Sequence, residues 1–350
     1  MKVISVVGAR PQFVKLAPVA EALSAAGIDH QIVHTGQHYD ERMSDAFFAD
    51  LVIPTPDYNL AVGSGRHGAQ TGEMMSKLEP VLSEEQPDWV LTYGDTNSTL
   101  AAAITAVKLH LPLAHLEAGL RSFNRLMPEE HNRVLTDHAS DLLLAPTELA
   151  MDNLRREGLA DRTQFVGDVM ADVCLRVTES ATPPQLPAGV SQTQGYLLAT
   201  IHRAENTDDP ARLGAILAAL RSQPIPVVLT AHPRLVAKAN DAGLSLAGGA
   251  LHTVEPYRYP DMIAVMAGAR AVVTDSGGLQ KEAYLVNVPC ITVRTETEWV
   301  ETVTAGWNTL DPDLDQANNW ANASKPADPA PGLYGSGKAA THVAEALLQS

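Results

Sequence analysis

KVISVVGARPQFVKLAPVAEALSAA, residues 2–26, is the stretch that decides the fold class. Residues 2–7 form an apolar run rich in β-branched side chains, which is typical of a buried strand. Gly8 and Pro11 interrupt that run, and residues 12–26 then have the periodicity of a helix. A strand, a glycine turn and a helix in this order predict a βαβ unit and therefore a parallel sheet.

The same alternation of strand and helix continues along the chain and predicts an α/β protein in two halves of similar size. The segment ESATPPQLPAGVSQTQG, residues 179–195, lacks periodicity and is predicted to link the two halves. Thr147 is predicted to cap the N-terminus of one helix and Gly158 its C-terminus. We expect strands over residues 2–7, 31–34, 89–93, 111–116, 141–145, 196–200, 227–230, 251–254, 271–274 and 290–294, and helices over 12–26, 40–50, 70–84, 98–110, 129–139, 147–157, 209–221, 259–267, 278–286 and 337–349.

Composition and charge argue against several classes of protein. The 350-residue chain has a formal net charge of −16, and so strong a negative field disfavours nucleic-acid binding. The cysteines, Cys174 and Cys290, lie in separate halves and suggest neither a disulfide framework nor a metal site. The apolar run at the N-terminus ends too early for a signal peptide, and no run approaches the roughly 18 apolar residues of a membrane span. We therefore expect a cytoplasmic protein with no nucleic-acid and no membrane partner.

The stretch HLEAGLRSFNRLMPEEHNR, residues 115–133, gathers acidic, basic and histidine side chains directly after an apolar run. Ligand crevices in α/β sheets lie at the carboxyl ends of the strands, so polar residues at a strand end are candidates for a site. Asp95 ends the strand over residues 89–93, and it would share the crevice with Glu117 and Glu129. Neighbouring carboxylates move each other's pKa, which suits proton transfer. The alternative is a solvated loop with surface ion pairs.

Other strand ends carry groups suited to an anionic ligand. In TDSGG, residues 274–278, small residues precede a helix, and a helix N-terminus offers free N–H groups to phosphate. Arg10 follows the first strand, and Lys15 lies about one turn into the next helix. The second half opens with a strand that ends in TIHRAEN, residues 200–206. The structural alternatives are a tight turn, a local ion pair and a core histidine.

Several familiar motifs are absent from the sequence. No G-x-G-x-x-G follows the first strand and no Walker G-x-x-x-x-G-K occurs, which argues against the usual forms of NAD binding and ATP hydrolysis. No G-x-S-x-G nucleophile elbow is present, and no His, Cys and Asp spacing fits a zinc or di-metal site. The carboxylates and arginines at the strand ends can instead serve as acid or base on a bound anionic substrate.

Together these segments resemble the bacterial non-hydrolysing UDP-N-acetylglucosamine 2-epimerase family. The matching motifs run in the family's order from residue 8 to about residue 340. The resemblance implies a glycosyltransferase-B-type fold with the active site in the cleft between two Rossmann-like domains. These would be an N-terminal domain at 1–178 with the carboxylates, a UDP-binding domain at 195–336, and a C-terminal helix at 337–350 that returns to the first domain. The motifs are GARPQFVKLAPV, TGQHYD, YGDTNSTLAA, HLEAGLRSFNRLMPEEHNR, TIHRAEN, TDSGGLQKEA, VPCITVRTETEWVE and YGSGKA.

The resemblance also implies the reaction. The C2 proton of UDP-N-acetylglucosamine leaves as UDP departs from C1, which gives 2-acetamidoglucal, and UDP adds back with a proton on the other face. Asp95, Glu117 and Glu129 would form the acid/base group, and His202 would assist the departing phosphate. The family uses no metal and no nicotinamide cofactor, and it forms homodimers. Candidates for binding the UDP-sugar are Arg10, Lys15, Arg133, Arg203, Glu205, Asn206, Ser276, Gly277, Gly278 and Glu282, with Glu282 on the ribose.

The chain departs from the family's common pattern at several positions. Gln12 stands where the common opening GTRPEAIK has Glu, and the common TERPE is TEWVE at residues 297–301. Met262 stands where an aromatic residue is expected near the uracil. Glu73 aligns with an arginine that many members use to bind a second, activating UDP-N-acetylglucosamine, so we expect this activator site to be missing.

Three alternatives to this substrate and class stay open. GARPQF and TEWVE also resemble the branch that epimerises UDP-2,3-diacetamido-2,3-dideoxyglucuronate, whose extra carboxylate calls for another cation such as Arg294 or Arg125. A glycosyltransferase of the same fold and a non-catalytic nucleotide-sugar sensor are the other two. The carboxylates favour an epimerase, because a sensor needs no acid or base and a transferase needs an acceptor groove.

Overall fold

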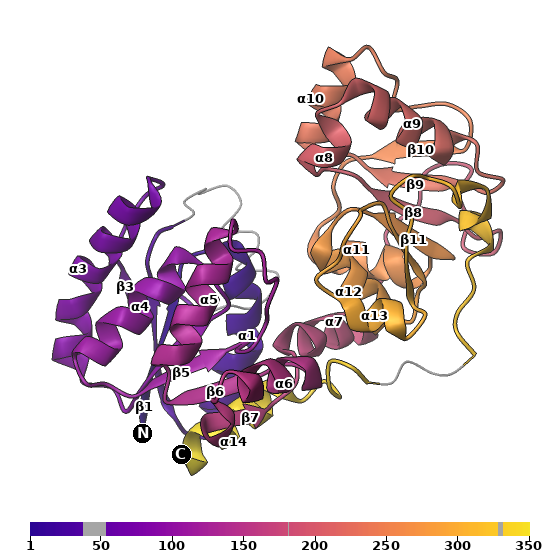
Figure 1. Ribbon diagram of the computed structural model, residues 1–350. Helices are drawn as coiled ribbons and strands as arrows, with labels where there is room; N and C mark the ends of the chain where they lie inside the picture. The colour runs from indigo at the N-terminus through magenta and orange to yellow at the C-terminus, as the bar shows by residue number, and fades with distance from the viewer. Residues whose placement is uncertain (38–53, 181, 328–331) are drawn as a thin grey trace. The chain divides into compact units, whose positions relative to one another are not determined.

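The computed structural model describes residues 1–37, 54–180, 182–327 and 332–350, except for the side chain of Arg10. Two compact units make up the chain (Figure 1): unit 1 is Met1–Val173 with Gly332–Ser350, and unit 2 is Cys174–Pro331. The division falls inside helix α7 (Val169–Ser180), so it precedes the boundaries expected at residues 178 and 195. The helix expected over residues 40–50 lies outside the described residues.

Unit 1 is built on a seven-stranded sheet in the order β3-β2-β1-β4-β5-β6-β7. All its strand pairs are parallel, and β1 lies between β2 and β4, which is the order of a doubly wound sheet. The strands are β1 (Lys2–Val7), β2 (Asp29–His34), β3 (Tyr58–Asn59), β4 (Trp89–Tyr93), β5 (Leu113–Leu116), β6 (Leu142–Ala145) and β7 (Thr163–Phe165). The helices besides α7 are α1 (Arg10–Ala25), α3 (His67–Glu85), α4 (Asn97–Lys108), α5 (Pro128–Ala139), α6 (Glu148–Arg156), the 3-10 turn η1 (Ala160–Arg162) and α14 (Ala339–Gln349).

The register of this sheet brings three polar turns to one edge. Val6 of β1 pairs with Thr92 of β4, and Tyr93 of β4 pairs with Leu116 of β5. The turns that follow β1, β4 and β5 therefore begin side by side at the carboxyl ends of the strands. This is the edge at which α/β sheets hold ligands.

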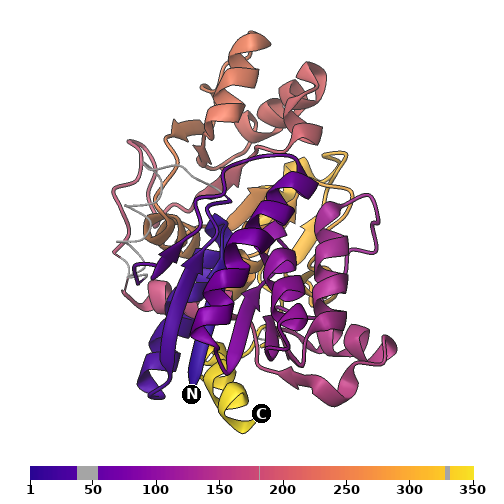
Figure 2. The ribbon, with the colours of Figure 1, turned by 90° about the vertical axis from the view of Figure 1, so that its left-hand side faces the viewer.

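Helices cover both faces of the unit 1 sheet. On one face α3 and the Ala-rich α4 pack against β1, β2, β4 and β5, and small side chains such as Ala102 and Ala106 are fully buried there. Helix α14 packs against α1 although it lies at the far end of the chain. Figure 2 shows α14 in yellow near the N-terminus, so both termini lie at the same end of unit 1.

Unit 2 repeats the plan with a six-stranded parallel sheet in the order β10-β9-β8-β11-β12-β13. Its core joins the inward side chains of β8, β9 and β11 to one face of α9 and to Trp320, which is 1% exposed. The strands are β8 (Leu197–Thr200), β9 (Val227–Thr230), β10 (Leu251–Val254), β11 (Ala271–Thr274), β12 (Cys290–Thr292) and β13 (Asn308–Leu310). The helices are α8 (Ala204–Thr207), α9 (Pro210–Arg221), α10 (Pro233–Asp241), α11 (Tyr259–Ala267), α12 (Gly277–Leu285), α13 (Val300–Thr304) and the 3-10 segment η2 (Ala317–Asn322).

The predicted cap of α6 is present in the structure. The Thr147 side chain accepts a hydrogen bond of 3.1 Å from the N–H of Ala150, which satisfies one of the free donors of the first turn. At the other end Glu157 is the C-cap, and Gly158 follows it with a φ of 78°. Gly158 is thus one residue later than predicted, at the left-handed position where glycine is favoured.

We expect His30 on β2 to make stability depend on pH. Its Nε2 lies 2.8 Å from Ser5 Oγ, and burial lowers the pKa of His30 from 6.5 to about 4, against the opposing charges of Asp57 and Asp29. Unfolding therefore takes up a proton below pH 6.5, so the stability that neutral His30 contributes is complete above pH 6.5 and is lost as the pH falls through 4. That loss amounts to about 3 kcal/mol.

Urea unfolding of the wild type and of His30→Gln at pH 7 and pH 4 measures this effect. The free energy of unfolding of the wild type minus that of His30→Gln should be about 3 kcal/mol lower at pH 4 than at pH 7. Parallel pH profiles of the two proteins would contradict the account of His30.

Candidate active site

Glu117 and Lys15 form a buried ion pair at the carboxyl edge of the unit 1 sheet. Glu117 directly follows β5, and the Lys15 Nζ on α1 donates to its Oε2. Glu117 is only 7% exposed and has a φ of 70°, a strained value of the kind that clusters at functional sites. Gly94 adjoins the pair: a Cβ there would lie 3.3 Å from Glu117 Oε2 and 3.6 Å from Lys15 Nζ.

Asp95 comes directly after Gly94 and pairs with a cation on another element. Its Oδ2 lies 2.5 Å from Nη2 of Arg133 on α5. Its backbone carbonyl accepts a hydrogen bond of 2.9 Å from the side-chain amide of Asn132. The structure thus brings together Lys15, Asp95, Glu117 and Arg133, which we call the carboxylate cluster.

Glu129 and Glu130 are neighbours at the start of α5, but they have different surroundings. Glu130 is 5% exposed and accepts three hydrogen bonds of 2.9 Å from Ser122 and Phe123. Burial would raise the pKa of Glu130, but these bonds and Arg133 outweigh it and lower the pKa. Within the described residues, no hydrogen bond joins Glu129 to a member of the carboxylate cluster. Its acid/base role stays a prediction.

In unit 2, His202 follows β8 and is held by Asp275, which follows the neighbouring β11. His202 Nδ1 lies 3.2 Å from Asp275 Oδ1. The same buried carboxylate accepts hydrogen bonds from the backbone N–H groups of His202 and Arg203 at 3.1 and 3.0 Å. Burial would raise the pKa of Asp275, but the bonds from His202, Asn206 and Arg203 lower it, so Asp275 is a fixed anion behind the imidazole.

The other predicted residues of TIHRAEN differ in their surroundings. Asn206 is buried, and its amide donates to Asp275 at 3.1 Å and to the Val293 carbonyl at 2.9 Å, so it holds Asp275 in place. Arg203 is partly exposed, and its guanidinium lies 3.7 Å from Glu298. Glu205 is exposed at the start of α8. Direct contact of these residues with a nucleotide stays a prediction.

The turn at residues 276–278 opens the nine-residue helix α12 and is here called the anion turn. Ser276 is the N-cap residue, and its side chain makes no capping hydrogen bond. A side chain added to Gly278 would meet nothing within 4 Å, so the backbone is open on that side. The free N–H groups of a helix N-terminus suit phosphate. Glu282 lies one turn further along α12 and is 6% exposed.

The TEWVE segment, residues 297–301, contacts the anion turn through Trp299. The Trp299 indole N–H donates a hydrogen bond of 2.8 Å to the Gly277 carbonyl, and Lys281 Nζ lies 4.4 Å from the centre of the indole ring. Arg294 makes two hydrogen bonds, of 2.9 and 3.0 Å, to the carboxylate of Glu298. Sequence reasoning missed Trp299 and Asp275 as supports of the site. Asp275 carried the same signal as Asp95, an acid at a strand end.

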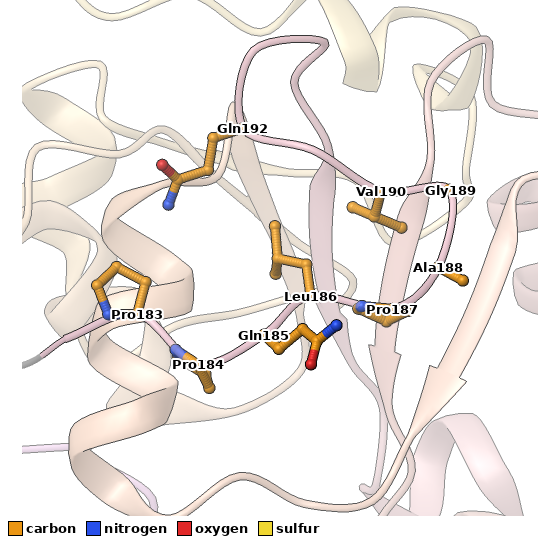
Figure 3. Close-up of a pocket in the computed structure, with 9 residues that line it drawn as sticks. All are labelled: Pro183, Pro184, Gln185, Leu186, Pro187, Ala188, Gly189, Val190 and Gln192. Atoms are coloured by element: carbon orange, nitrogen blue, oxygen red, sulfur yellow. The ribbon is translucent and has the colours of Figure 1, made fainter.

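An open pocket of about 600 Å³ lies elsewhere in unit 2, along the linker segment. Figure 3 shows that residues from Pro183 to Gln192 curl around it. Its lining contains no titratable side chain, so it offers no acid or base and is not a candidate for the chemistry. Within the described residues, no group of three or more side chains could hold a metal ion.

The comparisons with known proteins decide the family. The family model for UDP-N-acetylglucosamine 2-epimerase matches residues 21–348. The chain belongs to this epimerase family. The UDP-2,3-diacetamido-2,3-dideoxy-D-glucuronate 2-epimerase of Pseudomonas aeruginosa is 46% identical to it over the whole of both chains. The UDP-N-acetylglucosamine 2-epimerase of Methanocaldococcus jannaschii is 40% identical over 92% of this chain and 94% of its own.

Solved structures of family members share the fold. The UDP-GlcNAc 2-epimerase of Methanocaldococcus jannaschii has a TM-score of 0.85 at 37% identity, with all of both chains covered. The enzyme of Neisseria meningitidis, bound to UDP-GlcNAc, has a TM-score of 0.84 at 29% identity, again over both whole chains. The predicted fold class is thereby confirmed: two parallel-sheet α/β domains of glycosyltransferase-B type.

Membership of the epimerase family gives the class of enzyme. Its members are UDP-sugar 2-epimerases, so the chain is an isomerase that acts on a nucleotide sugar. The activity named for these family members is 2-epimerisation, rather than glycosyl transfer or nucleotide-sugar sensing. In the described part of the chain, no helix is both long and apolar enough to cross a membrane.

Proposed function

We propose that this enzyme inverts C2 of UDP-N-acetylglucosamine to give UDP-N-acetylmannosamine by elimination and re-addition of UDP. One observation carries the proposal: a buried carboxylate and a partly exposed one, Glu117 and Asp95, stand at adjacent strand ends, each beside a cation. Two carboxylates in different surroundings can hold different protonation states, as removal and return of a proton on opposite faces of C2 require.

The carboxylate cluster is assigned the proton transfers. One carboxylate takes the C2 proton while the C1–O bond to UDP breaks and a C1–C2 double bond forms. For return to the other epimer, the second carboxylate delivers a proton to the opposite face of C2 as the diphosphate oxygen attacks C1. Lys15 places a positive charge beside Glu117, and Arg133 places one beside Asp95.

The groups of unit 2 are assigned the leaving diphosphate. His202 would donate a hydrogen bond to the phosphate as negative charge develops, and Asp275 keeps its ring oriented. The anion turn offers backbone N–H groups to the same charge. Arg203, near the start of α12, adds a positive charge, and Glu282 is proposed for the ribose.

A second substrate, UDP-2,3-diacetamido-2,3-dideoxyglucuronate, is favoured by one specific observation. The Pseudomonas aeruginosa relative of that name matches the chain from end to end. The geometry favours UDP-N-acetylglucosamine, because Arg294, one of the two cations considered for the extra carboxylate, is already held by Glu298. The other, Arg125, is exposed in unit 1. Location in the cytoplasm and assembly as a homodimer are further predictions.

Product analysis with both nucleotide sugars tests the choice. The enzyme is incubated separately with UDP-N-acetylglucosamine and with UDP-2,3-diacetamido-2,3-dideoxyglucuronate, and the epimers are separated by chromatography. We expect UDP-N-acetylmannosamine to form with the higher kcat/KM. Conversion of the diacetamido sugar alone would replace the first candidate by the second, and conversion of neither would overturn the proposed reaction.

Removal of one hydroxyl from the anion turn should weaken nucleotide binding. A hydrogen bond to a charged group is worth about 1.5–3 kcal/mol, so Ser276→Ala should bind UDP roughly 10- to 150-fold more weakly. Calorimetric titration of UDP measures the affinity, with Ser222→Ala as a control because Ser222 is exposed at the end of α9. Unchanged affinity in Ser276→Ala would show that the hydroxyl does not contact the phosphate.

A further inference from the structure

His115, in the middle of the unit 1 sheet, has an acceptor at each ring nitrogen. It lies on β5 and is fully buried. Its Nδ1 is 2.6 Å from Oδ1 of Asp137, and its Nε2 is 2.7 Å from the carbonyl oxygen of Gly94. A carbonyl only accepts, and so does an ionised carboxylate. Because a neutral imidazole carries a single N–H, both short contacts are hydrogen bonds only if both ring nitrogens are protonated.

The charges around His115 favour the same protonation state. Asp137 is fully buried and also pairs with Arg121 at 2.7 Å, and Arg121 in turn makes two hydrogen bonds to Glu157 at 2.8 and 2.7 Å. With His115 as a cation, this network holds two positive and two negative charges. With a neutral His115, the fully buried Asp137 would share its one cation, Arg121, with Glu157, which is partly exposed and also lies 3.2 Å from His138 Nε2. A buried carboxylate short of positive charge is strongly unfavourable.

Asp137 remains the anion of this network. Burial would raise the pKa of Asp137, but His115 and Arg121 outweigh burial and lower it. Near Gly94 lie the ion pair of Lys15 with Glu117 and the pairs of Arg133 with Asp95 and Glu130. The charged group within hydrogen-bond distance of the His115 ring is Asp137.

The hydrogen bond between His115 and the Gly94 carbonyl links His115 to Asp95, one of the proposed catalytic groups. Gly94 is left-handed, with a φ of 60°, and its carbonyl belongs to the peptide group that leads into Asp95. His115 holds that peptide group from one side, and the Asn132 amide holds the carbonyl of Asp95 at 2.9 Å. Loss of the contact would let the peptide rotate and carry the Asp95 carboxylate away from its working position.

We propose that His115 is a positioning residue: a buried imidazolium whose two N–H groups tie the Gly94 carbonyl to Asp137 and so fix the direction of the Asp95 carboxylate. Its effect on catalysis rests on the function proposed above for Asp95. Its protonation state does not, and it is measured separately.

Nuclear magnetic resonance of the whole enzyme labelled with ¹⁵N-histidine tests the protonation state. Two-bond ¹H–¹⁵N correlation spectra are recorded at pH 7, and the His115 signals are assigned in the wild type. We expect both ring nitrogens of His115 to give protonated shifts, because each faces an acceptor. An unprotonated Nδ1 or Nε2 would overturn the proposal, whatever the activity of the enzyme.

The positioning role is tested with His115→Gln. A glutamine side chain donates through a single amide group, so it cannot replace both N–H groups of the imidazolium. We expect kcat to fall about 10²-fold, the cost of a misplaced catalytic group, while KM and UDP affinity change less than threefold. His252→Gln on β10 of unit 2 serves as the matched control, with full activity. A folded His115→Gln with wild-type kcat would overturn the positioning role.

If His115→Gln does not fold, Asn132→Ala provides the second variant. It removes the other tether of the Gly94–Asp95 turn without touching the charged network. We expect a loss in kcat of at least tenfold with KM unchanged, and unaltered kcat would overturn the claim that this turn positions Asp95. Failure of the proposed epimerase function would show differently, as an inactive wild type with an intact His115 spectrum.

Discussion

Replacement of Asp95 by Asn, or of Glu117 by Gln, lowers kcat about 10²–10⁴-fold, the range lost when a general acid or base is removed. Each variant keeps the shape of its side chain but can no longer take or give a proton at neutral pH. Glu117→Gln also leaves Lys15 without its buried partner, so it should in addition lower the free energy of unfolding. Initial rates of epimer formation and urea unfolding measure the two effects.

Glu79→Gln is the matched control for these carboxylate variants, because Glu79 is exposed on α3. Its rate should equal that of the wild type. Further, the double variant should lose no more than a small factor beyond the worse single variant, since residues that act as a unit are not additive. Near-normal turnover in both single variants would remove Asp95 and Glu117 from the mechanism.

The second large effect is expected at His202. His202→Gln removes the donor proposed for the departing phosphate, so kcat should fall about 10²–10³-fold, the usual cost of one donor aimed at developing charge. Asp275→Asn should lower kcat roughly 10²-fold, because the His202 ring would lose its orientation. The asparagine would turn an amide nitrogen, which cannot accept, toward N–H groups that now donate to Asp275.

Rates and calorimetric UDP titrations separate these two roles from simple loss of binding. We expect UDP affinity to change less than tenfold in both variants while kcat falls. Asp241→Asn at the end of α10 is the control, since Asp241 is exposed. A His202→Gln enzyme with unchanged kcat would show that the imidazole takes no part in departure of the phosphate.

The buried strands were the most predictable part of the fold. The ranges expected for β1, β4, β9 and β11 match the structure, because mostly apolar runs between turn residues leave little choice. The half-buried edge strand β10 also has its expected range. The sequence did not reveal β3, β7 and β13, which lie at sheet edges and are two or three residues long. Such edge strands bury few side chains, so they leave little periodicity to detect.

The candidate site was predictable only as a set of strand ends. Acids within two residues of the end of a buried strand gave Asp95 and Glu117. The partner of Asp95 is Arg133, which is far away in the sequence and is brought close by the packing of α5. The sequence could not tell which of Glu129 and Glu130 faces inward, because neighbouring residues on a helix point in different directions. The structure gives the inward place to Glu130.

Proton NMR of the enzyme with UDP-N-acetylglucosamine in D₂O tests the central claim most directly. Inversion through loss and return of the C2 proton must exchange that proton with solvent. We predict that deuterium appears at C2 of UDP-N-acetylmannosamine as it forms, together with traces of UDP and 2-acetamidoglucal. Formation of the epimer with its original C2 proton in place would contradict the account.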